Sequence, residues 1–126
     1  MRILISVMLV IAGLIHLLPL TGALGAARLE KLYGLPFADA NLAVLMRHRA
    51  VLFGLLGSLL IAGAFRPELQ AVAIIAGFVS VLYFLLLAWP VDHFSAPIAR
   101  IWNADMIALA CLAVAAAAWL TSPPQG

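Results

Sequence analysis

Apolar residues occur along this chain in four long runs, separated by short segments that hold most of the charged residues, glycines and prolines. The hydrocarbon core of a bilayer is about 30 Å thick, so a helix that crosses it needs roughly 17–25 predominantly apolar residues. Each run has that length. The pattern therefore predicts an all-α, polytopic membrane protein in which residues 1–126 form a single transmembrane domain, with spans at about residues 3–20, 42–65, 69–89 and 98–120.

Short connections and a capping residue predict how the spans are arranged. Arg66-Pro67-Glu68 leaves room only for a tight turn, so the second and third spans should be antiparallel neighbours in a four-transmembrane-helix antiparallel bundle. Asp39 is a candidate N-cap, which starts the second helix near Asn41. That start places Arg47-His48-Arg49 inside the helix.

The first connection contains a short amphipathic stretch. Leucines and a tyrosine alternate there with charged residues before Gly34 and Pro36 stop the pattern. Such a segment typically lies along a membrane surface, so we expect a short interfacial helix in this connection.

The first span also has features of a secretory signal peptide. Arg2 supplies a basic start, and Ala23-Leu24-Gly25 is similar to a small-residue cleavage site. However, the apolar region is longer than the usual 7–15 residues of a signal peptide, and His16 and Pro19 would lie at its end. We therefore expect the first span to be retained.

Composition excludes several classes of protein. Hydrophobic residues make up 67% of the 126 residues and charged residues only 10%, with a mean hydropathy of +1.19, which rules out a soluble domain. The basic residues are scattered, so we expect no nucleic-acid partner. Cys111 is the single cysteine, which excludes an intramolecular disulfide.

Small residues recur every four positions in the second span, at Gly54, Ser58 and Ala62. This spacing lets two helix backbones approach closely. We interpret it as packing within the chain, with a homodimer as the alternative.

Polar residues gather at one depth of the predicted bundle. With a rise of 1.5 Å per residue, Arg49 lies about 24 Å from the far end of its span and Asp105 lies about 22 Å from the end of the fourth, so both reach one level. All four spans bring polar groups to this half, which gives seven candidate ligand-binding residues: His16, Arg47, His48, Arg49, Tyr83, Asn103 and Asp105.

Ionisable groups at membrane depth normally face a bundle interior and pair with one another. One interpretation is therefore a staple in which Asp105 neutralises an arginine and joins two helices. A second is a ligand pocket, because basic groups outnumber acidic ones and favour an anion. A third is metal or haem ligation by His16 and His48, but no carboxylate partners accompany them. We expect no metal and no cofactor.

Several segments resemble a family of small bacterial four-helix membrane proteins of unknown function. The resemblance covers nearly the whole chain and rests on these motifs: His16-Leu17-Leu18-Pro19, Arg28-Leu29, Leu32-Tyr33-Gly34, Asn41-Leu42, Asp105 and above all Arg47-His48-Arg49-Ala50-Val51-Leu52-Phe53-Gly54. In size and hydropathy the chain is also similar to DoxX-like proteins. Members of such families sometimes carry the name phosphopantetheine adenylyltransferase. That enzyme is a soluble α/β protein with a Thr/His-x-Gly-His motif, which this sequence lacks.

Three functional hypotheses follow for a multi-pass protein of the bacterial inner membrane whose partners are membrane lipids. The first is a pocket that binds or transforms an anionic amphiphile, such as a lipid, fatty acid or isoprenoid phosphate. In that pocket an arginine holds the anion, and His48, Asp105 or His16 is the candidate catalytic residue for proton transfer. The second is a structural or accessory subunit of a membrane complex. The third is a haem or quinone redox protein or a small transporter.

Overall fold

The computed structural model describes residues 2–20, 25, 27, 30, 31, 39–91, 93 and 96–122. Four long helices account for most of them: α1 (Arg2–Leu17), α3 (Ala40–Phe65), α4 (Gln70–Ala88) and α5 (Ala96–Thr121), with a 3-10 turn, η2 (Pro67–Leu69), between α3 and α4. These ranges contain no strand. The all-helical prediction is confirmed, whereas the interfacial helix expected in the first connection falls largely on residues outside the described part.

Four helical segments are long and apolar enough to cross a membrane, as the sequence predicts. They are Arg2–Leu20, Ala40–Phe65, Pro67–Ala88 and Ala96–Thr121. The second, third and fourth segments each begin two residues earlier than expected, and α5 therefore includes Pro97 in its first turn. Proline is tolerated there because the first N–H groups of a helix have no partner within the helix.

The start of α3 is capped as predicted. The Asp39 side chain accepts hydrogen bonds from the backbone N–H groups of Asn41, at 2.8 Å, and Leu42, at 3.4 Å. This cap satisfies donors that would otherwise lack a partner within the helix. It fixes the start of α3 and therefore the position of the Arg47–Arg49 segment within it.

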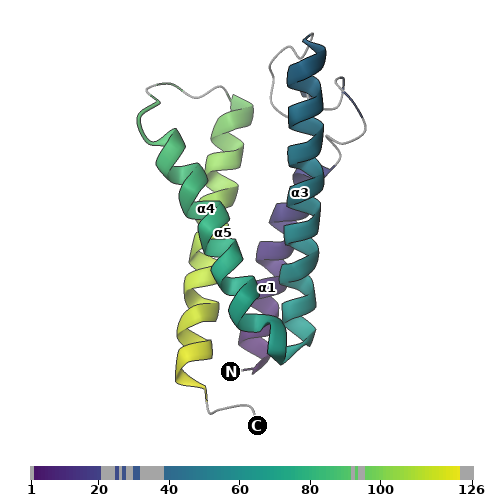
Figure 1. Cartoon of the computed structure of the whole chain (residues 1–126). Helices are drawn as coiled ribbons and strands as arrows, with labels where there is room; N and C mark the ends of the chain where they lie inside the picture. Colours follow the sequence, from purple (N-terminus) through teal and green to yellow (C-terminus); the bar gives the residue numbers. More distant parts are fainter. Residues whose placement is uncertain are drawn as a thin grey trace.

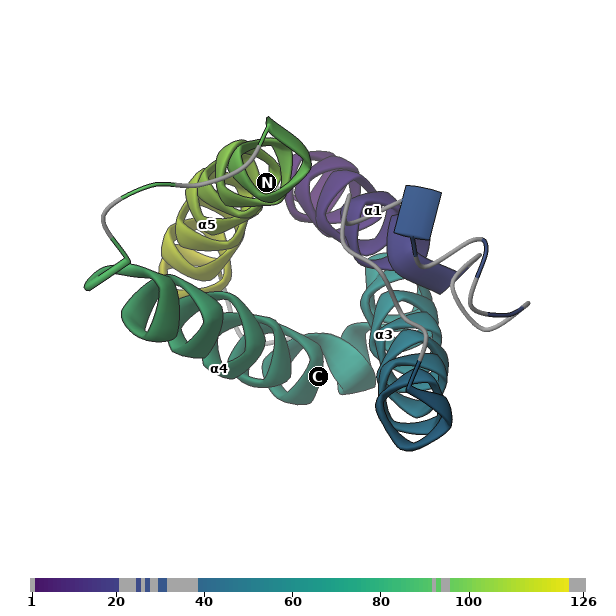
Figure 2. The same cartoon turned by 90° about the horizontal axis from the view of Figure 1, so that it is seen from above.

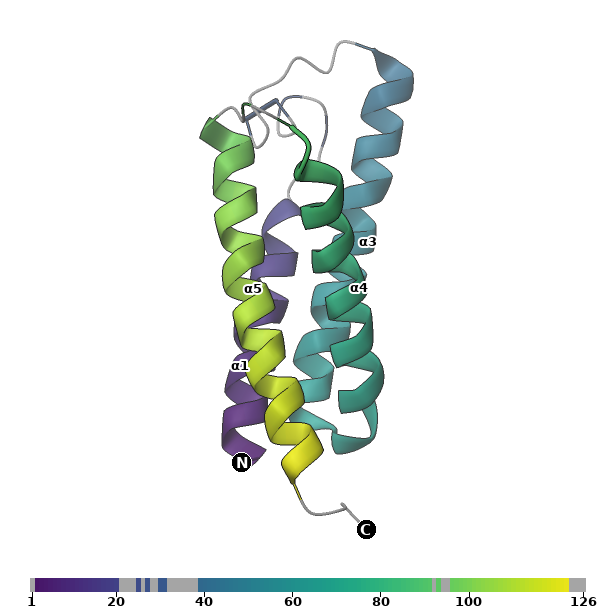
Figure 3. The same ribbon diagram turned by 90° about the vertical axis from the view of Figure 1, so that its left-hand side faces the viewer.

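The helices form a ring in the order α5, α1, α3, α4 (Figure 2). Contacts are most extensive between α1 and α3 and between α1 and α5, followed by α4 with α5 and α3 with α4. The first residues of α1 and the last residues of α5 lie at the same end of the molecule as η2 (Figures 1 and 3). In this ring α3 and α5 are diagonal to each other, as are α1 and α4.

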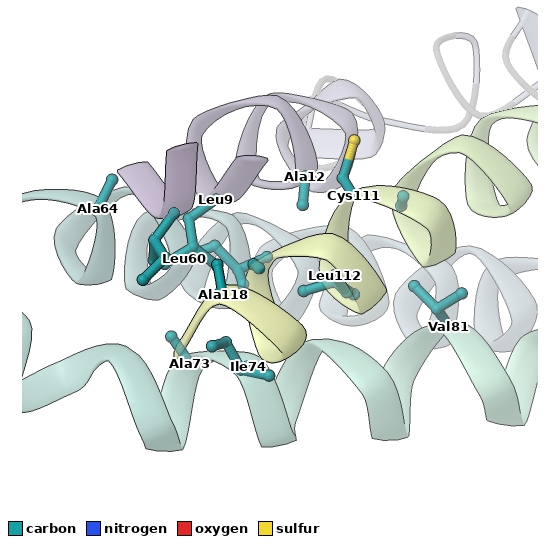
Figure 4. Packing of buried hydrophobic residues seen from close by; sticks show 13 residues of the cluster. Leu9, Ala12, Leu60, Ala64, Ala73, Ile74, Val81, Cys111, Leu112 and Ala118 are labelled. Atoms are coloured by element: carbon teal, nitrogen blue, oxygen red, sulfur yellow. The ribbon is translucent and has the colours of Figure 1, made fainter. Parts of the chain in front are cut away.

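Most of the hydrophobic core lies in the half of the bundle that contains η2, and Val81 extends it past the middle of α4. Four large side chains, one from each helix, are fully buried: Leu9, Leu60, Val81 and Leu112. They pack between alanines of the neighbouring helices, including Ala12, Ala73 and Ala118 (Figure 4). Large residues set against small ones leave little space, so this half of the bundle is closed.

The closest approach between α1 and α3 is at two glycines. A Cβ added to Gly57 would lie 2.8 Å from the Gly13 carbonyl oxygen, and one added to Gly13 would lie 2.9 Å from the Gly57 oxygen. Of the predicted small-residue face, Gly54 is buried against Leu20, whereas Ser58 is exposed. The close contact is therefore made at Gly57, because this residue faces a glycine on α1.

Candidate functional site

A cavity of about 290 Å³ lies in the half of the bundle away from η2. Its lining comes from α1 and the 3-10 turn that follows it, from α3 and from α5; no described α4 residue contributes. Seven lining residues are apolar: Ile15, Leu18, Pro19, Phe53, Pro97, Ile101 and Ala104. The four polar ones are His16, Arg49, Arg100 and Asp105. The cavity thus combines apolar walls with a small group of charged and polar side chains.

Arg49 and Asp105 lie on diagonal helices but line the same cavity. Both side chains are half-buried, and the Arg49 guanidinium attracts the Asp105 carboxylate electrostatically. This attraction acts across the interior of the bundle, because α3 and α5 are not neighbours in the ring. Arg100 adds a second guanidinium from α5. The charged groups of the cavity are therefore two cations and one anion.

Phe53 positions the Arg49 guanidinium. The guanidinium carbon lies 4.5 Å from the centre of the Phe53 ring, within the range of a cation–π interaction. On a helix, residues four positions apart lie on the same face, so Phe53 is suitably placed to contact Arg49. The Phe53 ring also lies 5.8 Å from the His16 imidazole. The aromatic ring thus contacts both polar groups at this wall of the cavity.

His16 is almost completely buried, with 2% of its surface exposed. Its Nδ1 lies 2.8 Å from the Ala12 carbonyl oxygen, which only accepts hydrogen bonds, so Nδ1 is the donor. In the neutral imidazole Nε2 is then an acceptor, and the Ser80 hydroxyl donates to it at 3.3 Å. This contact joins α1 to α4 across the other diagonal of the bundle.

The structure brings three of the seven candidate site residues, His16, Arg49 and Asp105, to the cavity. Arg47, His48 and Asn103 are exposed. Consecutive helical residues are about 100° apart, so an inward Arg49 directs its two predecessors elsewhere. Tyr83 is 61% exposed, on a helix whose described residues do not line the cavity.

Sequence reasoning missed Arg100, Phe53 and Ser80 as parts of the site. Phe53 follows Arg49 by four residues and could have been found from helical spacing. Arg100 lies near a connection, where a basic residue is common whether or not it belongs to a site. Nothing in the sequence pointed to Ser80, because its contact with His16 joins residues 64 positions apart.

Metal ligands do not gather at this site. Among the described residues, no group of three or more histidine, cysteine, aspartate or glutamate side chains is placed to hold a metal ion.

Comparisons with protein-family models, with curated proteins and with solved structures find no match to this chain. The geometry of the cavity is therefore the basis for a functional proposal.

Proposed function

We propose that this chain is a multi-pass protein of the bacterial inner membrane, an antiparallel bundle whose cavity binds an anionic amphiphile such as a fatty acid, a lipid or an isoprenoid phosphate. The observation that supports this proposal is the set of charged groups in the cavity. The apolar cavity is lined by one carboxylate and two guanidinium groups, of which Arg49 is half-buried and Arg100 is exposed, so positive charge is in excess.

Arginine suits this role because of its geometry and its charge. The planar guanidinium presents several N–H donors that match the oxygens of a carboxylate or phosphate, and it stays protonated at any pH of interest. Charged groups at membrane depth are costly unless they find partners. Asp105 supplies one negative charge against two positive charges, so the net charge of the cavity favours an anionic headgroup.

The apolar walls favour an amphiphile over a small polar anion. Small-molecule sites typically measure about 300–1,000 Å³, and the cavity of about 290 Å³ lies at the lower limit. That volume accommodates a headgroup and the first part of an acyl chain. Ile15, Leu18 and Ile101 would contact the chain.

A structural role for the protein uses the same residues differently. In that case Arg49 and Asp105 form an internal staple of an accessory subunit, and the cavity holds no specific ligand. Their electrostatic attraction across the bundle favours this second candidate. The two functions differ in one measurable property, the presence of a bound anionic molecule.

Redox and transport functions receive less support from the geometry. To ligate haem, the Nε2 atom of His16 would have to give up its contact with the Ser80 hydroxyl, and the second candidate ligand, His48, is exposed. A proton-coupled transporter is expected to carry a carboxylate deep in a span. Asp105 instead lies closer to the start of α5 than to its end, in the half of the bundle away from η2.

Lipid analysis of the purified protein tests the proposed pocket. We expect protein purified in mild detergent to retain an anionic amphiphile that native mass spectrometry detects. Arg49→Gln should lower its occupancy about tenfold or more, because a hydrogen bond to a charged group contributes about 1.5–3 kcal/mol. Arg47→Gln is the matched control: it removes an exposed arginine from the same helix and should leave occupancy unchanged. Equal occupancy in the Arg49→Gln variant and the unmodified protein would refute the pocket.

Orientation in the membrane provides a separate prediction. Five basic residues lie in or beside the first and third connections: Arg28, Lys31, Arg47, Arg49 and Arg100. Only Arg2 and Arg66 lie toward the other side. Because cytoplasmic segments are enriched in lysine and arginine, both termini should be extracytoplasmic. A C-terminal fusion to a reporter that fluoresces only in the cytoplasm should therefore stay dark, and bright fluorescence would reverse the orientation.

A further inference from the structure

Three of the four helices line the cavity, and the described residues of the fourth do not. Its described lining residues come from α1, the turn after α1, α3 and α5. In the ring of helices, α4 occupies the remaining side, between α3 and α5 (Figure 2). The side of the cavity that lacks lining residues therefore faces α4.

Contact between α3 and α4 is concentrated near the turn that joins them. A Cβ added to Gly63 of α3 would lie 3.0 Å from the Ala73 Cβ of α4, and one added to Gly77 of α4 would lie 3.3 Å from the Leu60 side chain of α3. All four residues belong to the half that contains η2. Although the two helices are consecutive, their overall contact is less extensive than that of α1 with either neighbour.

Beyond this closed half α4 follows α5 and diverges from α3. The start of α4 lies near α3 and its end lies near α5, so α4 is tilted across the bundle (Figures 1 and 2). Ser80, which reaches His16 across the interior, lies near the middle of α4. From about this residue to its end, α4 lies farther from α3 than it does near η2 (Figures 1 and 2).

Large apolar side chains are exposed on both α3 and the second half of α4. Leu45 and Leu52 on α3 are exposed, as are Leu82 and Leu86 on α4. In a membrane such side chains contact acyl chains. Charged residues line the cavity instead: Arg49 and Asp105 are half-buried there, and Arg100 is exposed. An amphiphile with its headgroup in the cavity would therefore meet an apolar passage toward the bilayer on this side.

We infer that the acyl chain of the bound amphiphile leaves the cavity between α3 and the second half of α4, so that the ligand reaches the site sideways from the hydrocarbon core of the membrane. This inference rests on the proposed function. The small cavity volume supports it, because a long chain needs more space than about 290 Å³ and must continue outside.

Two isomeric photoreactive fatty acids test the inference on the full-length protein in detergent. One carries a diazirine beside the carboxyl group and the other carries it at the far end of the chain. The first should crosslink to cavity residues of α1 and α5, within residues 15–19 and 97–105. The second should crosslink to residues 81–88 of α4 and to residues 45–52 of α3. Crosslinked peptides are mapped by mass spectrometry after chymotryptic digestion.

Specific labelling is separated from general labelling of lipid-exposed surfaces by two comparisons. Excess unlabelled fatty acid and the Arg49→Gln variant should each reduce both crosslinks about tenfold, whereas Arg47→Gln should leave them unchanged. Suppose that crosslinking of the carboxyl-end probe depends on Arg49 but that the chain-end probe labels residues 21–38 or 89–95. The lateral route is then wrong and the pocket remains. If neither crosslink depends on Arg49, both the pocket and the route are refuted.

Discussion

Asp105→Ala is expected to lower the free energy of unfolding by about 1–3 kcal/mol. The change removes the carboxylate that attracts the half-buried Arg49 guanidinium in the cavity. The added change Arg49→Ala should recover part of this loss, which gives a coupling energy of about 0.5–3 kcal/mol in a double-mutant cycle. Unfolding in detergent, followed by circular dichroism, measures each variant.

Arg47 provides the matched control for this cycle. It lies on the same helix but is exposed, so Arg47→Ala and Asp105→Ala should be additive. Additive effects for Arg49 and Asp105 as well would mean that the two charges are independent, which would remove support from both the pocket and the staple.

Bound lipid measured on the same variants distinguishes the two functions. If Arg49 and Asp105 are coupled and the anionic amphiphile is lost with either change, the cavity is a ligand site. If they are coupled and bound lipid is unchanged, the pair acts as a staple between diagonal helices. The stability measurement alone does not separate these outcomes, because both functions require the charges to interact.

Gly57→Ala is expected to destabilise the fold by about 1–3 kcal/mol, because the new Cβ would lie 2.8 Å from the backbone oxygen of Gly13 and 2.8 Å from the Leu17 side chain. A backbone atom moves only if α1 and α3 separate, and this pair has the most extensive contact in the bundle. The midpoint of thermal unfolding in detergent should fall.

Gly54→Ala is the control for this prediction. It adds the same methyl group three residues earlier, where the nearest atoms belong only to the flexible end of the Leu20 side chain. That side chain can rotate, and alanine favours the helix over glycine, so the effect should be small or stabilising. If the two variants lose equal stability, the close approach at Gly13 and Gly57 does not set the spacing of α1 and α3.

The sequence by itself determined the fold class and the helix positions. Long apolar runs determine where helices form in a membrane, because an unpaired backbone N–H or C=O group in hydrocarbon costs several kcal/mol and a helix satisfies these groups within one segment. Asp39 predicted the start of α3, and Arg66-Pro67-Glu68 predicted the turn into α4. Each of these signals is local, so neighbouring residues suffice to interpret it.

Depth along the helices was also accessible from the sequence. A constant rise of 1.5 Å per residue places Arg49 and Asp105 at one level, and the structure brings both to one cavity. Sequence could not choose among Arg47, His48 and Arg49, because each helix can rotate about its axis without changing depth. Packing of α3 against α1 sets that rotation, with Gly57 facing Gly13, and it directs Arg49 inward.

Tertiary structure alone decided which helices are diagonal and where the bundle is closed. The contact of His16 with Ser80 and the tilt of α4 away from α3 depend on the order of helices around the ring, which apolar runs do not encode. A lipid-facing helix and an inward-facing one have similar hydropathy, because lipid tails are as apolar as a packed core. Side-chain size at the contacts therefore determines the arrangement.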